Sequence, residues 1–380
     1  MYKIMTPGPT QVSEQVRMAR SWECTNPDLD EAFVEFYRDT CEKISDLLYT
    51  NNETLILGGE GILGLEAACA SLTEPGDPVL VLDNGVFGRG FSDFVSMYGG
   101  VPTLYSVDPR NTMDVEALAE YLKEHHDFKY ATVVHGDTPS GMLNDISSIC
   151  PLLKSYGILT VVDSVSAMFA EEVHVDDYQI DVLCGGSQKV ISAPPGLTIV
   201  TISADAKAAM AARKTPIASF YANLTTFAHY YEEKWFPYTM PISDINGLRA
   251  AIDAIEAEPD MIERHARIAA ASREAVTKAG LKLYQESGFS NTVTVFEVPE
   301  GVTDRQILDT MKEDHNIMLA GSFDFLAGKV IRIGHMGNNA TYENMVETFC
   351  ALDATFAKLG VKLSAGMRQV FEETYGSVNE

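Results

Sequence analysis

The chain has 380 residues, of which 46% are hydrophobic, so it is long enough for one large core with a smaller domain beside it. Its 54 acidic and 28 basic side chains give a formal net charge of −26, which argues against nucleic acid or an anionic membrane surface as partner. No apolar run reaches the roughly 20 residues of a membrane helix, and the first residues lack a signal-peptide pattern, so we expect a cytoplasmic protein. The six cysteines show no CxxC pairing, which predicts neither a metal site nor a disulfide framework.

The first predicted element is a long amphipathic helix. Asn26 is the expected N-cap and Pro27 the first helical residue, and apolar side chains such as Leu29 continue at helical spacing to Leu48. We expect this helix to open the main domain.

A series of apolar segments follows, each with the length and composition of a strand. They cover residues 54–57, 78–83, 103–107, 131–136, 159–165, 181–186 and 197–203. Helix-like stretches, such as 114–125 and 146–156, separate several of them. This alternation predicts an α/β fold whose mostly parallel sheet is covered by helices on both faces.

Beyond about residue 245 the sequence changes character. Long charged helices are expected over 246–280 and 341–359, around strands near 292–298 and 329–333. We therefore predict a large domain over residues 1–245, with an N-terminal segment at the substrate site, and a smaller α+β domain over residues 246–380.

Two polar residues directly follow neighbouring predicted strands: Asp163 in DSVSA and Lys189 in GGSQK. The carboxyl ends of strands are where open α/β sheets bind ligands. A lysine can form an imine with a pyridoxal ring, while a carboxylate pairs with the protonated ring nitrogen. Taken singly, Asp163 could be a helix cap and Lys189 a solvated lysine, but their joint placement favours pyridoxal chemistry.

A glycine-rich loop offers an alternative. Gly59, Gly61 and Gly64 have GxGxxG spacing between a predicted strand and helix, and Asp83 ends the next strand. This spacing is typical of dinucleotide binding, so a Rossmann-type oxidoreductase is the rival interpretation. Glu60 lies inside the loop, where its charge would oppose a pyrophosphate, and the glycines would serve equally well to turn a strand tightly into a helix.

A single arginine, Arg332, lies on the apolar strand of KVIRIGHMGNNAT (329–341). A guanidinium held by a strand can form two parallel hydrogen bonds with a carboxylate, which predicts recognition of a small 2-oxo acid or amino acid. The alternative is an arginine that packs along the domain edge with a solvated head.

Together these motifs resemble the class V aminotransferases of the fold-type-I pyridoxal phosphate superfamily. The matching segments, after TPGPT near the start, are NGVFG (84–88), HGDTPSG (135–141), VDSVSA (162–167), GSQK (186–189), APPG (193–196), FPYT (236–239) and RIGHMG (332–337). The resemblance implies the fold-type-I aminotransferase fold and a homodimer whose active sites lie at the subunit interface.

The resemblance also implies roles for individual residues. Lys189 is the imine-forming lysine that moves the proton, Asp163 is the partner of the ring nitrogen, and Arg332 binds the substrate carboxylate. The side chains expected around the ring are Phe87 and Val165 on its two faces, Thr138 at its phenolic oxygen, Gln188 at a phosphate contact, and Thr239, where the neighbouring subunit reaches in.

The glycine loop, with Glu60, Gly61 and Ile62, is expected to bind the cofactor, but Glu60 departs from the glyoxylate-using members, which have a phosphate-binding serine there. A carboxylate beside a dianionic phosphate is unfavourable by about 1 kcal/mol or more. Members that use unphosphorylated pyridoxamine as a substrate carry glutamate at this place. Two residues depart from that match. Gln188 is the residue type expected at a phosphate contact, and Phe323 stands where a second arginine is expected.

Two activities therefore remain open. In the first, pyridoxamine and pyruvate give pyridoxal and alanine, and the vitamin B6 compound is a substrate without phosphate. In the second, bound pyridoxal 5'-phosphate carries amino groups from alanine or serine to glyoxylate or pyruvate.

Overall fold

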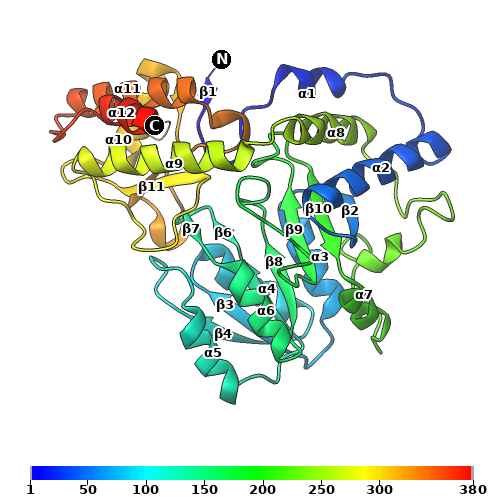
Figure 1. Ribbon diagram of the computed structural model, residues 1–380. Coiled ribbons are helices and arrows are strands. Elements are labelled where there is room, and N and C mark those ends of the chain that lie inside the picture. Colours follow the sequence, from blue (N-terminus) through cyan, green and yellow to red (C-terminus); the bar gives the residue numbers. More distant parts are fainter. Residues whose placement is uncertain (1, 378–380) are drawn as a thin grey trace.

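The computed structural model describes residues 2–377, and its centre is a sheet that, within these residues, has seven strands in the order β2-β10-β9-β8-β5-β3-β4 (Figure 1). The strands are β2 (Glu53–Gly58), β3 (Pro78–Asp83), β4 (Val101–Ser106), β5 (Tyr130–Val134), β8 (Leu159–Asp163), β9 (Val182–Gly186) and β10 (Leu197–Ile202). Neighbouring strands are parallel except at β10, which runs antiparallel to both β2 and β9. The predicted α/β fold with a mostly parallel sheet is confirmed.

Helices cover this sheet, which explains why its strands are so apolar. Strands β5, β9 and β10 are buried along their whole length, whereas the edge strand β4 is partly exposed. The helices of this part are α1 (Glu14–Ala19), α2 (Glu31–Leu47), α3 (Gly61–Leu72), α4 (Val86–Met97), α5 (Val115–Glu124), α6 (Ile146–Ser155), α7 (Ala204–Ala211), the 3-10 turn η1 (Leu224–Phe227) and α8 (Ile242–Glu256).

The predicted start of the first long helix is wrong. Helix α2 begins at Glu31, because the Asp30 side chain accepts a hydrogen bond of 3.0 Å from the backbone N–H of Ala32 and caps it. The Asn26 side chain instead accepts from the N–H of Asp28 and closes a turn before the helix. Leu29, which was expected on the apolar stripe, is exposed.

The single helix predicted over residues 246–280 is also wrong. The chain forms α8 up to Glu256 and a separate helix, α9 (Met261–Lys278). Pro259 lies in the break, where it has no N–H to donate and disfavours helical geometry in the residue before it.

The C-terminal helices gather at one end of the molecule, beside β1 near the N-terminus (Figure 1). Here β11 (Val293–Glu297) pairs antiparallel with β13 (Val330–Gly334), and β1 (Lys3–Ile4) pairs parallel with β12 (Ile317–Met318). Around them lie α9, α10 (Asp304–His315), α11 (Tyr342–Lys358), α12 (Met367–Ser377) and the 3-10 turns η2 (Asp324–Leu326) and η3 (Gly337–Asn339), while β6 (Gly136–Asp137) and β7 (Met142–Leu143) form a short hairpin.

This end has a hydrophobic cluster of its own, which includes Met5 from the N-terminal segment and Phe349 from α11. The core around the main sheet extends through α8 and also includes Met261 and Met336. The domain boundary between residues 245 and 246 stays a prediction. Nowhere in residues 2–377 does a helix combine the length and apolar composition needed to cross a membrane.

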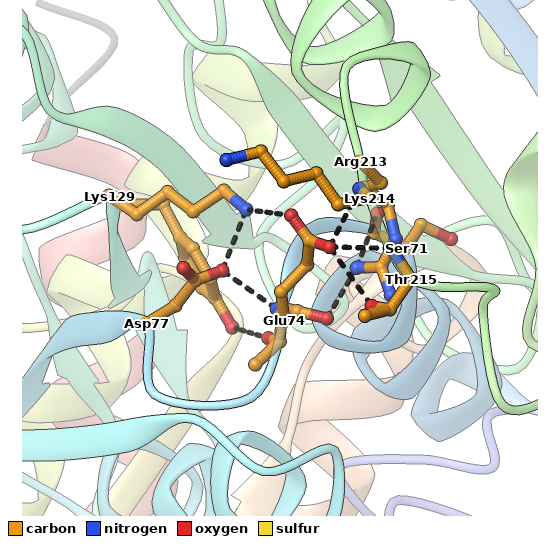
Figure 2. A network of polar contacts seen from close by, with 9 residues as sticks. Ser71, Glu74, Asp77, Lys129, Arg213, Lys214 and Thr215 are labelled. Atoms are coloured by element: carbon orange, nitrogen blue, oxygen red, sulfur yellow. Dashed lines mark hydrogen bonds and ion pairs between the residues drawn. The ribbon is translucent and has the colours of Figure 1, made fainter.

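Helix α3 is anchored at its C-terminal end by the polar network in Figure 2. Arg213 Nη1 donates to the carbonyl oxygen of Ser71, at 3.3 Å, where helix carbonyls lack intrahelical partners. The Glu74 carboxylate accepts from the backbone N–H groups of Lys214 and Thr215, each at 2.8 Å. These contacts hold α3 in place, and its other end faces the candidate site.

Candidate active site

A cavity of about 250 Å³ lies at the carboxyl ends of β2, β5, β8 and β9. Parallel strands present these ends at one edge of the sheet, so side chains distant in sequence meet there. The cavity is lined by Glu60, Ile62, Leu65, Phe87, Gly136, Thr138, Asp163, Val165, Ser166 and Lys189. Most of the predicted site residues are therefore brought together.

Lys189 lies in the loop that follows β9. Its Nζ donates to the carbonyl oxygen of Pro7, at 2.7 Å, and to Thr138 Oγ1, at 3.3 Å. Burial, and after it the positive charge of Arg332, lower the pKa of Lys189 to about 8. The amine is therefore neutral in a useful fraction of molecules near neutral pH, as a base or nucleophile requires.

The N-terminal segment closes over this lysine. Gly8 has a left-handed φ of +99°, and a Cβ at this position would lie 2.8 Å from Lys189 Nζ. An N-terminal segment was predicted at the site, but Pro7 and Gly8 were not among the predicted site residues. The available signal was the glycine between two prolines in TPGPT.

Asp163 is the last residue of β8 and is buried. Its Oδ1 accepts a hydrogen bond of 2.9 Å from the backbone N–H of Val165. Burial raises the pKa of Asp163 to about 7, because the apolar surroundings penalise the charged form. A cationic group bound opposite this carboxyl would favour its ionised form.

Glu60 is the N-cap of α3. One oxygen of its carboxylate accepts from the backbone N–H of Ile62, at 3.0 Å, and the other accepts from the side-chain amide of Gln188. Gly61 lies against Val165, where a Cβ would come within 3.0 Å of the valine methyl. The positive end of α3 thus already holds a carboxylate.

Phe87 is held by Asp137, which was not among the predicted site residues. The backbone N–H of Phe87, in the first turn of α4, donates to Asp137 Oδ1 at 3.1 Å. Asp137 is buried, and burial raises its pKa. The signal available in the sequence was the acid directly before Thr138 in HGDTPSG.

Arg332 lies in the middle of β13. Its Nε donates to the carbonyl oxygen of Gly321, at 2.6 Å, and its Nη1 donates to that of Thr138, at 3.2 Å. Burial lowers the pKa of Arg332 to about 10, so the guanidinium stays charged at neutral pH. The Phe323 ring lies 5.8 Å from the guanidinium carbon and meets the Phe87 ring edge-on.

Thr239 is not brought to this cavity. It is exposed and donates to Asp28 at 2.8 Å. Its predicted contact concerns the neighbouring subunit and stays a prediction.

The dinucleotide alternative fails on the strand order. A Rossmann fingerprint places the acid on a strand next to that of the glycine loop. Here β3, which ends at Asp83, is separated from β2 by β10, β9, β8 and β5. Asp83 instead accepts hydrogen bonds from Arg89 and Ser106. Across the described part of the chain, His, Cys, Asp and Glu side chains form no group suited to a metal ion.

Comparison with known proteins agrees with this geometry. Residues 16–321 match the family Aminotransferase class-V. Pyridoxamine–pyruvate transaminase of Mesorhizobium japonicum is 35% identical over 346 residues, which cover 89% of this chain and 88% of that protein. Alanine–glyoxylate aminotransferase of Felis catus is 30% identical over 358 residues, 92% of this chain and 86% of that protein.

Solved structures show the same fold. The crystal structure of ureidoglycine–glyoxylate aminotransferase from Bacillus subtilis superposes with a TM-score of 0.95 at 28% identity, covering 99% of this chain and 98% of that one. The match to the family spans most of the sequence, and its fold is that of the fold-type-I aminotransferases. The chain therefore belongs to the class V aminotransferase family.

Proposed function

We propose that this enzyme transfers the amino group of unphosphorylated pyridoxamine to pyruvate, forming pyridoxal and alanine. Members of the family typically use pyridoxal 5'-phosphate. The observation that carries the proposal is the Glu60 carboxylate at the N-terminus of α3, hydrogen-bonded to Ile62 and Gln188.

The cavity fits a pyridoxal ring. Asp163 offers a buried carboxyl to a ring nitrogen, and Phe87 and Val165 supply apolar surface for the ring faces. Thr138 places a hydroxyl beside the Lys189 amine, where a phenolic oxygen would find a donor. These four contacts and the volume of the cavity support the binding of a single aromatic ring next to the lysine.

The cavity does not suit a phosphate as well. A helix N-terminus is a common phosphate site, because its free N–H groups and dipole favour an anion. Here Glu60 already takes the N–H of Ile62. A phosphate would have to displace this carboxylate or lie beside it, and two like charges about 4 Å apart repel by about 1 kcal/mol in water and about 4 kcal/mol near a protein surface.

The chemistry would be divided among few residues. A bound pyridoxal ring supplies an electron sink that stabilises negative charge on the carbon beside the transferred nitrogen. Lys189 Nζ then moves a proton between that carbon and the α-carbon of the acid, which its lowered pKa of about 8 favours. Asp163 holds the ring nitrogen and keeps it protonated.

Arg332 would bind the carboxylate of pyruvate. Its hydrogen bonds to Gly321 and Thr138 fix the guanidinium on one side and leave donors for the acid. Its contact with Thr138, which also binds Lys189, places the carboxylate site next to the amine.

A second candidate activity is a pyridoxal-phosphate-dependent alanine– or serine–glyoxylate or –pyruvate aminotransferase. The observation in its favour is Gln188. This side chain is buried next to the end of α3, and within the described residues its Oε1 has no hydrogen-bond partner, so the amide could turn toward a phosphate if Glu60 moved away.

We also propose a homodimer. Trp22, Phe220, Tyr221 and Trp235 are each more than half exposed, which is unusual for large apolar side chains unless another chain covers them. The segment that carries three of them leads to Thr239. Light scattering on the purified protein tests this proposal, and a monomer at micromolar concentration would contradict it.

The decisive variant for the vitamer is Glu60→Ser. Removing the carboxylate should take its negative charge away from the N-terminus of α3 and free the Gln188 amide for a phosphate, so affinity for pyridoxal 5'-phosphate should rise about tenfold or more, the effect of one charge-assisted hydrogen bond. Affinity for unphosphorylated pyridoxal should not rise. Absorbance titration measures both affinities, and borohydride reduction with mass mapping of the Lys189 peptide identifies the bound vitamer.

Asp114→Ser is the matched control, because Asp114 caps α5 in the same way but does not line the cavity. It should leave both affinities unchanged. A wild-type protein that is purified with a phosphopyridoxyl group on Lys189 would favour the second candidate. An unaltered vitamer preference in Glu60→Ser would refute the electrostatic argument.

A further inference from the structure

Helix α4 has no side-chain cap of its own. Gly85 is at its N-cap position and has no side chain to accept from the first N–H groups, which lack intrahelical partners. The N–H of Phe87 donates instead to Asp137 Oδ1, which belongs to a residue 50 positions further along the chain. A Cβ on Gly85 would lie 2.6 Å from the carboxyl carbon of Asp137, so the glycine makes room for this distant cap.

The second oxygen of Asp137 shapes its own turn. Oδ2 accepts from the backbone N–H of Ser140, at 3.2 Å, and from its hydroxyl, at 2.6 Å. The backbone N–H of Gly141 donates to the Asp137 carbonyl oxygen, at 2.7 Å, and closes the turn. Asp137 is 1% exposed, and three donors satisfy its carboxylate, as a buried ion requires.

The turn that Asp137 fixes contains Thr138. The Thr138 hydroxyl accepts from Lys189 Nζ, at 3.3 Å, and its carbonyl oxygen accepts from Arg332 Nη1, at 3.2 Å. Asp137 itself does not line the cavity, although both of its sequence neighbours do. The Asp137 carboxylate is therefore one hydrogen bond away from the backbone of Phe87. Through the next residue, Thr138, it is connected to Lys189 and Arg332.

We propose that Asp137 is a positioning residue that holds Phe87, Lys189 and Arg332 in a fixed mutual arrangement. The inference rests on the proposed function in one respect: it takes Phe87 as the ring contact and Arg332 as the carboxylate contact. Loosening this one side chain should therefore weaken ring binding and 2-oxo acid use together, although Asp137 touches neither ligand.

The charge of Asp137 has a separate effect on the lysine. The charged groups that face Lys189 are Arg332, which lowers its pKa, and Asp163, Glu60 and Asp137, which raise it. Replacing Asp137 by a neutral residue should lower the pKa of Lys189. Activity requires the neutral amine, so the acidic limb of the pH profile should move to lower pH.

Three full-length variants separate position from charge. In Asp137→Ala both are lost, and kcat/KM for pyruvate and affinity for pyridoxal should each fall between about 10- and 100-fold, the scale of a small misplacement of reacting groups. Asp137→Asn keeps an oxygen that can accept from Phe87, so the loss should be smaller and the acidic limb should still shift. Gly85→Ala displaces the carboxylate without removing its charge, so it should resemble Asp137→Ala in affinity and show no comparable shift.

Asp145→Ala is the control, since Asp145 caps α6 through Ser148 and does not line this cavity. Unchanged kinetics and affinity in Asp137→Ala, or an equal loss in Asp145→Ala, would each overturn the proposal. Pyridoxal affinity is read from absorbance without any 2-oxo acid. Failure of the wild type to use pyruvate would therefore overturn the proposed function while the test of Asp137 stands.

Discussion

Two helix N-termini border the cavity, and a carboxylate occupies each of them. Glu60 caps α3 from its own N-cap position and is exposed. Asp137 caps α4 from a distant hairpin and is buried. The two helix ends have the same dipole and the same free N–H groups. They differ in where the carboxylate comes from and in whether it is exposed or buried.

The difference separates two roles for the same chemical group. An exposed local cap can be exchanged without moving its surroundings, so Glu60 can select the charge of the ligand. A buried cap that reaches across from another loop fixes the distance between two elements, so Asp137 can set geometry. Together they leave neither helix end open to a phosphate, which is why we expect an unphosphorylated vitamer.

If Glu60 selects the ligand and Asp137 sets the geometry while Lys189 reacts, removing the lysine should have the largest effect. Lys189→Ala should lower kcat toward the upper end of the roughly 10²–10⁴-fold range of a lost acid–base group, and more if its covalent role is also lost. Single-turnover kinetics with pyridoxamine and pyruvate measure this change. Lys207→Ala, which removes an exposed lysine paired with Glu53, is the control. A loss no greater than that of the Glu60 or Asp137 variants would break the distinction between holding and reacting.

The comparison also predicts an order of stability. Asp137→Ala leaves three buried donors without an acceptor, so the free energy of unfolding should fall by about 3 kcal/mol. Glu60→Ala removes an exposed cap, which typically costs about 1 kcal/mol. Urea unfolding at neutral pH measures both. A larger loss for Glu60→Ala would reverse the assignment of the two roles.

The fold was largely predictable because the sheet is buried on both faces. Apolar segments bounded by polar or glycine residues mark β3 and β8 almost to the residue. The antiparallel direction of β10 and its place between β2 and β9 were not predictable, because they depend on pairing between strands far apart in sequence. The break at Pro259 was visible in the sequence, but the predicted helix ran across it.

The site contains residues that the sequence predicted and residues that it did not. Asp163 ends an apolar strand and Lys189 lies just past the end of another, so the rule for parallel sheets placed both at one edge. Asp137 also follows a predicted strand, but its role was not predictable, because its partner is the backbone N–H of Phe87, which any residue except proline would provide. Pro7 reaches Lys189 through a carbonyl oxygen, which carries no side-chain signal either.

A third carboxylate, Glu74, lies beyond the C-terminal end of α3. We expect its removal to have the smallest effect of the variants compared. Hydrogen bonds from the backbone of Thr215 and Lys214 lower the pKa of Glu74 to about 2, from an ordinary value of 4.5. Because the folded-state pKa is depressed, its contribution to stability is present above pH 4.5 and is lost as the pH falls through about 2. Glu74→Gln should therefore leave kcat unchanged and make the free energy of unfolding fall less steeply between about pH 5 and pH 2. Urea unfolding across this range measures how steeply the free energy of unfolding changes with pH.

An unchanged slope would mean that Glu74 keeps similar partners in the unfolded chain. A fall in kcat would mean that the C-terminal end of α3, which Glu74 anchors, is coupled to Glu60 at the N-terminal end.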